Sequence, residues 1–363
     1  MARRTDFALL GLTLLLLTIG LAMLYSTSAV LAQLRHHDSL YFLKRQLLWA
    51  GFGLLGLWVM RSIPYSTQRR LAAPALLVTF VALILVLVPV FGKEVGGARR
   101  WLTLGPLSIQ PSEFAKYTLL LYVARSLALN QERLDSFVHT YVPNMLVLGV
   151  TALLVFKEPD LGSAVVLAAT ASLQLLIAGV PWRYLTCTAL TGLPGLYWAV
   201  THVRFRMGRL MVFLNPWEDR QGGGYQAVQA LLALGHGGLL GIGLGQSQQK
   251  LFYLPEAHTD FIFAVIGEEL GLLGAAVLIV LFVMLLGRVL HIAVSCNDPF
   301  GTYLGLGIFV LLSLQVVMNL CVVIGLMPTK GLPLPFISLG GSNLLVSLMA
   351  IGTMLNIAEG GRA

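Results

Sequence analysis

Charged residues are scarce in this sequence of 363 residues. Only 11% are Asp, Glu, Lys or Arg, whereas 57% are hydrophobic. A soluble domain carries about 25% charged residues, so the composition excludes an ordinary soluble enzyme. It also excludes an unfolded chain, because disordered segments are rich in charge and poor in apolar side chains. The composition therefore predicts a chain that folds within a membrane.

Cysteine is also rare, with three in the whole chain. Cys187, Cys296 and Cys321 match neither a zinc ribbon nor a disulfide scaffold, so we expect inert free thiols. The chain contains no phosphate-binding loop, no dinucleotide fingerprint and no spacing typical of a metal site. Nothing in the sequence indicates nucleic-acid binding.

Long apolar runs make up most of the chain. A membrane helix needs about 20 mostly apolar residues. Ten stretches qualify, namely 7–32, 46–60, 71–91, 114–129, 142–156, 161–180, 184–200, 261–290, 303–326 and 339–357. None alternates like a barrel strand, so residues 1–363 are predicted to form one all-α polytopic domain of ten transmembrane helices. The first run is longer than the apolar core of about 7–15 residues in a signal peptide, and we interpret it as a retained helix.

Ten spans place both termini on one side of the membrane. Arg3 and Arg4 before the first span and Asp38 after it favour cytoplasmic termini. Ten basic residues then fall inside and eight in the short outer loops, so the positive-inside rule gives only weak support. Cations on the outer face indicate either an anionic ligand or contact with membrane lipid headgroups.

One loop, 201–258 between the seventh and eighth spans, is much longer than the others and faces outward. It begins with Arg204, Arg206 and Arg209, and it continues through a glycine-rich stretch. Residues 225–234 are predicted to form a short amphipathic helix. Long loops in compact domains are usually functional or disordered, and the apolar content favours a segment folded on the outer membrane surface.

A first group of ionisable residues flanks the start of the fourth span. Pro111 and Glu113 suit the first turn of a helix, and Lys116 lies three residues after Glu113, so the two can pair on one face. Two interpretations remain open: a snorkelling pair at a helix start, or a pair that lines a polar cavity with Arg99 and Arg100 beside it as an anion clamp.

A second group lies at two other outer turns. Asp160 is expected to cap the sixth span, and this purely structural role is the alternative to a functional one. Glu256, His258 and Asp260 crowd together before the eighth span, where Thr259 is a possible cap and Asp260 is expected in the first turn. Three such residues exceed what a cap requires, so Asp260 is predicted to be functional.

Glu268 and Glu269 lie deeper in the eighth span, between Gly267 and Gly271. The two glycines form a small-xxx-small pattern that permits close helix approach. Two adjacent acids at this depth need partners or water, and the sequence does not identify them.

Motifs along nearly the whole chain resemble the shape, elongation, division and sporulation (SEDS) family of peptidoglycan polymerases. The matching segments are 97–101 (GARRW), 110–116 (QPSEFAK), 158–162 (EPDLG), 224–226 (GYQ), 254–263 (LPEAHTDFIF) and 328–338 (PTKGLPLPFIS). Segments 25–30, 41–46, 267–271 and 329–332 are closer to the cell-division branch, whereas 332–335 is closer to the elongation branch. Leu339 and Asn343 depart from the family's usual pattern.

The resemblance implies ten spans, cytoplasmic termini and a location in the bacterial cytoplasmic membrane, at the division septum for that branch. It implies that lipid II is polymerised into nascent glycan at the outer face. It also implies an FtsI-like class B penicillin-binding protein as partner, with FtsQ, FtsL and FtsB for the division branch. A lipid II flippase and a non-catalytic scaffold are the alternatives.

The family's reaction turns an α-linked donor into a β-1,4 glycan, which is one inversion. Diphosphate is a good leaving group, so one carboxylate base plus cations suffices. We expect Asp260 to be the base, and Arg99, Arg100, Lys116, Lys44 and Arg45 to hold the diphosphate. The other substrate-binding candidates are Trp101, Glu113, Asp160, Glu256, His258 and Ser338. No protein ligand set for a metal is readable, although a divalent cation such as Mg²⁺ or Mn²⁺ could bridge the phosphates.

Overall fold

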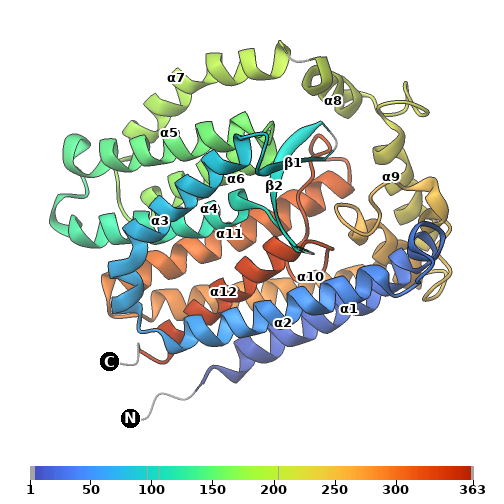
Figure 1. The fold of residues 1–363 in the computed structure, drawn as a ribbon, viewed down its shortest axis with the longest axis horizontal. Helices are drawn as coiled ribbons and strands as arrows, with labels where there is room; N and C mark the ends of the chain where they lie inside the picture. The colour runs from blue at the N-terminus through green and yellow to red at the C-terminus, as the bar shows by residue number, and fades with distance from the viewer. Residues whose placement is uncertain (1–4, 96, 106, 203, 361–363) are drawn as a thin grey trace.

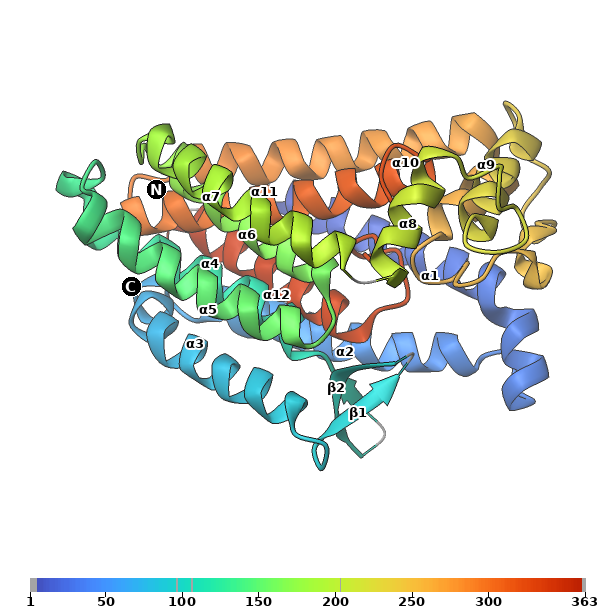
Figure 2. The same ribbon diagram turned by 90° about the horizontal axis from the view of Figure 1, so that it is seen from above.

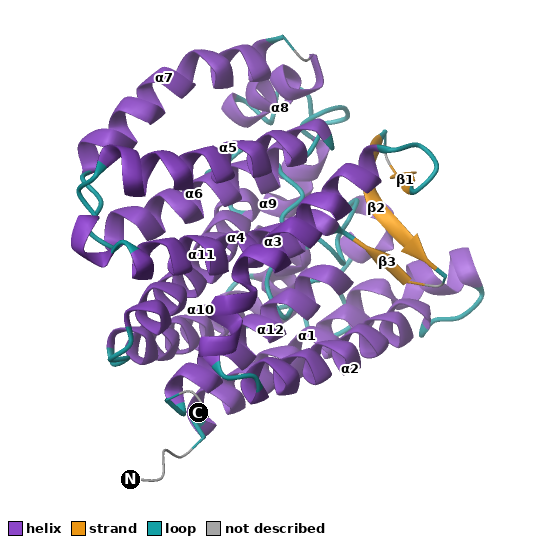
Figure 3. Cartoon of the chain, turned by 60° about the vertical axis from the view of Figure 1, so that its left-hand side comes forward, coloured by secondary structure: helices purple, strands orange, loops and turns teal. Residues whose placement is uncertain are grey.

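A computed structural model describes residues 5–95, 97–105, 107–202 and 204–360 (Figure 1). The chain is a helical bundle with one small sheet (Figure 3). The α-helices are α1 (Phe7–His36), α2 (Tyr41–Ser62), α3 (Tyr65–Leu87), α4 (Pro111–Leu129), α5 (Val142–Lys157), α6 (Leu161–Ile177), α7 (Trp182–Thr201), α8 (Arg204–Leu214), α9 (Tyr225–Gly237), α10 (Ile262–Val294), α11 (Pro299–Val323) and α12 (Gly341–Ala358). Three short helical turns are η1 (Gln131–Arg133), η2 (Phe137–Tyr141) and η3 (Gln249–Tyr253).

A helix lies on each of the ten stretches predicted to span the membrane, namely α1 to α7 and α10 to α12. Six stretches in the described part of the chain are long and apolar enough to cross a bilayer by length and composition: α1, α3, η2 with α5, α10, α11 and α12. Both termini lie at one end of the bundle, and α8, α9 and the sheet lie toward the opposite end (Figure 2).

The bundle core is built around α10, α11 and α12. Helix α2 packs along α12, α3 along α4, and α11 contacts α4, α6 and α10. Many large apolar side chains on α2, α3 and α10 are exposed, whereas Gln46, Asn319, Asn343 and Asn356 are buried. Apolar side chains outside and polar side chains inside the bundle are expected of helices that face lipid.

The prediction of an all-α chain is wrong for the segment between α3 and α4. Strands β1 (Gly92–Val95), β2 (Ala98–Leu104) and β3 (Leu107–Ile109) form an antiparallel sheet in the order β1-β2-β3. Lys93 pairs with Trp101, and Leu102 pairs with Ile109. The strands are short, with glycine and adjacent cations in place of a regular apolar alternation, so the usual strand signal is missing.

The segment predicted as a long outer loop is largely folded. The expected short helix at 225–234 is confirmed as α9, which packs along α10. Glycine permits this contact, because a Cβ at Gly237 would lie 1.9 Å from the carbonyl oxygen of Gly267. Gly267 thus serves the close helix approach that the sequence predicts, whereas Gly271 lies against the loop residues Leu239 and Gly241 instead of a helix.

Candidate active site

Asp260 lies in the tight turn that leads into α10, and its side chain is partly buried. The Asn319 side chain on α11 donates from Nδ2 to the carbonyl oxygens of Asp260 (2.9 Å) and Leu332 (2.7 Å). One buried amide thus joins this turn to the loop after α11. A Cβ at Gly331 would lie 3.1 Å from Asp260 Oδ2, so the loop backbone lies directly against the carboxylate.

The possible cap at Thr259 and the expected place of Asp260 in the first helical turn are both wrong. Helix α10 begins at Ile262, and its N-cap residue Phe261 has no side-chain cap hydrogen bond. Thr259 donates from Oγ1 to Glu256 Oε2 (2.9 Å), which closes the turn instead. Asp260 therefore precedes the helix, and among the described residues none donates a hydrogen bond to its carboxylate.

The surroundings of Asp260 make it a weaker acid than usual. Burial, followed by the nearby Glu256 carboxylate, raises the pKa of Asp260 from 3.8 to about 7. Asp160 acts in the same direction, and the Arg209 guanidinium partly opposes it. A carboxyl group with a pKa near 7 can both accept and release a proton near neutral pH, which suits a general base.

Two cations that the sequence did not single out belong to this site. Arg209 acts on the Asp260 carboxylate, and Lys330 directly precedes Gly331, which lies against that carboxylate. Arg209 on α8 donates from Nη1 to the carbonyl oxygen of Thr329 (3.0 Å). Lys330 follows in the same loop, and burial, followed by the charge of Arg209, lowers its pKa. Lys330 also interacts with Asp160. Arg209 and Asp160 act on both Lys330 and Asp260 and so link the two residues. The signals in the sequence were the basic start of the long loop and the 328–338 motif.

Asp160 caps α6, as predicted, and lies close enough to influence Asp260. It accepts from the backbone nitrogen (3.0 Å) and the Oγ (2.9 Å) of Ser163, and from Gln110 Nε2 at 3.4 Å. Its cap role is thus confirmed, while its influence on Asp260 and Lys330 places it at the site.

Arg100 holds the turn before α6. It donates from Nε to the carbonyl oxygen of Glu158 (3.0 Å) and from Nη2 to that of Pro159 (2.6 Å). The Glu158 side chain is fully buried, and among the described residues neither of its carboxylate oxygens has a hydrogen-bond partner. Burial, and then the charge of Asp160, raises the pKa of Glu158 to about 9, so this group is neutral at pH 7.

Glu113 and Lys116 form the expected pair, with Lys116 Nζ 2.7 Å from Glu113 Oε1. The lysine side chain is only 1% exposed, and Asn343 Nδ2 donates to Glu113 Oε2 (3.0 Å). The pair is therefore internal to the bundle rather than snorkelling. Asn343, a departure from the family pattern, completes it.

The remaining predicted cations contact residues other than Asp260. Lys44 pairs with Asp38 at 2.8 Å, and Arg99 pairs with Glu94 at 3.1 Å, all substantially exposed. Arg45 reaches Ser108 Oγ at 3.5 Å. Such exposed pairs are weak and can reorganise around a ligand.

Three further candidates hold local structure. Ser338 Oγ accepts from the backbone nitrogen of Leu334 (2.9 Å), and its carbonyl accepts from Gln46 Nε2 (3.2 Å). The ring of His258 packs on Phe42 at a centroid distance of 5.0 Å. Trp101 lies partly buried in the middle of β2.

A small cavity lies next to Arg209, between α8, α9 and the end of α11. Its volume is about 110 Å³, and it is lined mainly by apolar side chains, including Phe213, Leu231, Val322 and Met327. An apolar recess that ends at a cation suits a ligand with an anionic head and a hydrocarbon chain.

The charged group does not match a resident metal site. In the described ranges no group of three or more His, Cys, Asp or Glu side chains is placed to hold a metal ion. We therefore assign no step to the divalent cation that the sequence left open.

Comparison with known proteins identifies the family. The profile of the FtsW/RodA/SpoVE family of cell cycle proteins matches residues 7–362. The chain belongs to this family. The resemblance noted in the sequence motifs is thereby confirmed.

Members of the FtsW/RodA/SpoVE family are similar over almost the whole chain. A probable peptidoglycan glycosyltransferase FtsW from Trichlorobacter lovleyi is 45% identical over 355 residues, which cover 98% of this chain and 93% of that protein. Stage V sporulation protein E of Bacillus subtilis is 42% identical over 354 residues, with 98% and 97% coverage. The FtsW-like character expected from the sequence is confirmed by such relatives.

Solved structures of similar proteins share the fold. One, from a study of "structural coordination of polymerization and crosslinking by a peptidoglycan synthase complex", has a TM-score of 0.81 at 31% identity and covers 98% of this chain and 97% of its own. The rod shape determining protein RodA of Thermus thermophilus has a TM-score of 0.70 at 30% identity, with 97% and 96% coverage. This family member is thus a multi-pass membrane protein.

Proposed function

We propose that this chain is a peptidoglycan glycosyltransferase that polymerises lipid II into β-1,4 glycan at the outer face of the bacterial cytoplasmic membrane. In this proposal α1 to α7 and α10 to α12 cross the bilayer, and the termini are cytoplasmic. The end of the bundle that carries α8, α9 and the sheet faces outward. The names of similar family members and the geometry around Asp260 support this assignment.

The observation that carries the proposal is the Asp260 carboxylate itself. It is partly buried, it caps no helix, and its pKa is raised to about 7. A structural carboxylate is normally held by hydrogen bonds, which lower its pKa. A carboxyl group with a pKa near 7 and the Arg209 guanidinium close to it matches a general base next to an anion site.

The chemistry follows from these positions. The acceptor sugar's 4-hydroxyl oxygen attacks the anomeric carbon of the donor as the bond from that carbon to the diphosphate oxygen breaks. Asp260 takes the hydroxyl proton, and the polyprenyl diphosphate leaves as an anion. Arg209 and Lys330 stabilise the charge that develops on that leaving group, and the apolar cavity beside Arg209 accepts the first part of its hydrocarbon chain.

This arrangement changes the predicted diphosphate clamp. Arg100 holds the 158–160 turn and so acts through Asp160, whereas Lys116 is buried against Glu113. Arg99, Lys44 and Arg45 are on the outer surface, where they attract an anionic lipid headgroup. We assign the direct contacts to Arg209 and Lys330.

The flippase alternative needs a polar route through the bundle. The polar side chains in the interior are engaged with one another: Glu113 with Lys116 and Asn343, and Glu269 with Lys250. Such paired groups favour a bundle whose interior does not rearrange. Among the described residues, Glu158 and Asp260 are carboxylates without a hydrogen bond, and both lie in turns at the outer ends of helices. The geometry therefore supports polymerisation over transport.

A class B penicillin-binding protein is the proposed partner, with FtsQ, FtsL and FtsB for septal synthesis. The peptidoglycan synthase complex found among similar structures supports an assembly of this kind. The deciding experiment is polymerisation of purified lipid II by the purified chain with and without such a partner, with gel analysis of glycan. We expect glycan with the partner, and a chain that only moves lipid II between leaflets would contradict the proposal.

A further inference from the structure

Glu268 and Glu269 lie two turns into α10 and take no part in the chemistry proposed above. Their relative exposures are 0% and 1%. Two adjacent carboxylates buried at this depth are costly unless they are fully engaged. Their partners come from the long outer segment before α10, which indicates that the two carboxylates hold that segment in place.

The backbone hydrogen bonding of α10 is interrupted at this point by residues of the long outer segment. Gly271 has φ 68° and ψ −170°, which breaks the helical ladder. The carbonyl oxygens of Glu268 and Glu269 accept from the backbone nitrogens of Ile242 and Gly243, each at 3.1 Å. Their ordinary helical donors would be the backbone nitrogens of residues 272 and 273, which instead donate to residues 238 and 239 at 2.9 and 3.2 Å. Residues 238–243 therefore replace one turn of helix hydrogen bonding.

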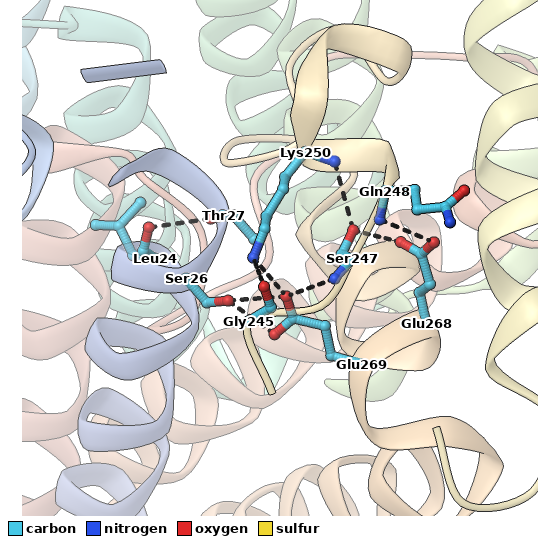
Figure 4. Close-up of polar contacts among 9 residues, drawn as sticks. All are labelled: Leu24, Ser26, Thr27, Gly245, Ser247, Gln248, Lys250, Glu268 and Glu269. Carbon is cyan, nitrogen blue, oxygen red and sulfur yellow. Dashed lines mark hydrogen bonds and ion pairs between the residues drawn. The ribbon is translucent and has the colours of Figure 1, made fainter. Parts of the chain in front are cut away.

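The two carboxylates hold the next stretch of the same segment (Figure 4). The Glu268 carboxylate accepts from the Ser247 hydroxyl and from the Gln248 backbone nitrogen (3.3 Å). Glu269 Oε1 lies 3.3 Å from Lys250 Nζ and accepts from the Ser247 backbone nitrogen at 3.4 Å. We call Ser247, Gln248, Lys250, Glu268 and Glu269 the anchor cluster.

Helix α1 completes the anchor cluster from the other side. Ser26 Oγ lies 2.8 Å from both Glu269 oxygens, and the Lys250 ammonium also contacts the Gly245 carbonyl oxygen. The lysine side chain is only 9% exposed. It thus serves as a built-in cation that offsets one of the two buried negative charges.

The anchored stretch leads directly to Asp260. Lys250 lies within η3, whose turn closes with a hydrogen bond from the Leu254 backbone nitrogen to the Gln249 carbonyl oxygen (3.0 Å). The chain then passes through the buried Leu254 and the turn at Glu256, which has φ 56°, to Asp260. Both ends of this ten-residue link are fixed to α10, one by the anchor cluster and the other by the helix start.

We infer that Glu268 and Glu269 are positioning residues that set the placement of Asp260 by clamping the start of its segment. This inference rests on the proposed function of Asp260. Asp260 faces Glu256 from its own turn, Arg209 from α8 and Asp160 from the cap of α6. Its environment therefore depends on how deeply the anchored segment is held against the bundle.

The test uses Glu269→Gln and Glu268→Gln in the full chain with its partner. A displacement of about 1 Å can cost about 10²-fold in rate, so we expect kcat to fall about 10²-fold with KM for lipid II little changed. Release from burial lowers a carboxyl pKa, so the acidic limb of the pH–rate profile should move to lower pH. Lys250→Met should lower kcat and shift the pH–rate profile as Glu269→Gln does. The double variant Glu269→Gln/Lys250→Met should lose no more activity than either of its single variants.

Glu359→Gln is the matched control, because the Glu359 side chain is only 6% exposed and pairs with Arg61 at 2.6 Å. Glu359 is the C-cap residue of α12 and also accepts from Thr5 near the N-terminus. The Glu359→Gln variant should lower thermal stability without moving the pH limb. Glu268→Gln and Glu269→Gln proteins with unchanged kcat and an unchanged acidic limb would overturn the inference. Losses of kcat that are proportional to the loss of thermal stability across the variants would also overturn it.

Labelling of Lys250 by a water-soluble acylating reagent gives a readout that does not depend on activity. We expect faster labelling in Glu269→Gln. Faster labelling with an unmoved pH limb would show that the anchor does not set Asp260, and would overturn the inference. An active Asp260→Asn protein would instead remove the proposed function, so the two failures are distinguishable.

Discussion

Replacing Asp260 by asparagine separates the proposed chemistry from the fold. The substitution keeps the size of the side chain and removes its ability to accept a proton. Asp260 is not the cap of α10, and the carbonyl group that Asn319 binds is unaffected. We therefore expect an intact bundle and an inactive site.

Two magnitudes follow from the structure. Loss of a general base typically costs about 10²–10⁴-fold in rate, so glycan synthesis should fall by at least 10²-fold. The rise in pKa from 3.8 to about 7 corresponds, as an upper bound, to about 4 kcal/mol of destabilisation of the folded state when the group is ionised. Asparagine carries no such penalty.

The sign of the stability effect depends on pH. Because folding raises this pKa, the folded state binds the proton more tightly than the unfolded state does. The wild-type chain therefore loses stability as the pH rises from about 4 to about 7, and it carries the full penalty above pH 7. Asp260→Asn should melt at a higher temperature than wild type at pH 8.5, and the difference should shrink toward pH 5.

The assay pairs gel analysis of glycan from lipid II with thermal unfolding of the same detergent-purified protein at both pH values. Normal polymerisation by Asp260→Asn would refute the catalytic assignment. Lower stability of the variant at pH 8.5 would refute the description of Asp260 as a buried, unsatisfied carboxylate. The two results test the chemistry and the electrostatics separately.

Three further predictions concern the same region. Glu256 raises the pKa of Asp260 and Arg209 lowers it, so Glu256→Gln should move the acidic limb of the pH–rate profile to lower pH and Arg209→Met to higher pH. Gly331→Ala places a methyl group about 3.1 Å from Asp260 Oδ2, so it should reduce kcat severalfold or more while the protein still folds. Lys116→Met leaves Glu113 buried without its cation and should destabilise the bundle by about 3–5 kcal/mol, with loss of lipid II use.

Matched variants check each of these results. Equal shifts in one direction for Glu256→Gln and Arg209→Met would contradict the electrostatic account. Gly149→Ala is the control for Gly331→Ala, because a Cβ there meets no atom within 4 Å, and it should leave kcat unchanged. Glu113→Gln combined with Lys116→Met should recover part of the stability, measured by thermal unfolding, because no charge is then left buried alone.

Helix positions were largely readable from the sequence. Every predicted span coincides with a helix, since runs of apolar residues have few other stable structures in a membrane. The local pairs were readable too: the cap at Asp160 and the ion pair of Glu113 with Lys116 depend only on spacing along one helix. The small sheet was missed because its short strands are held by hydrogen bonds to one another and lack the alternating apolar pattern that marks a strand in a sequence.

The sequence alone determined the membrane environment and the helix order, and it led to the prediction that Asp260 is functional, because each follows from composition or from residues close together in the chain. Only the tertiary structure decided what surrounds Asp260. Arg209, Gly331 and Asn319 reach it from segments separated by 50 or more positions, and burial shifts its pKa only after those segments pack. The partners of Glu268 and Glu269 were likewise invisible, because they depend on a break in α10 into which a distant loop inserts.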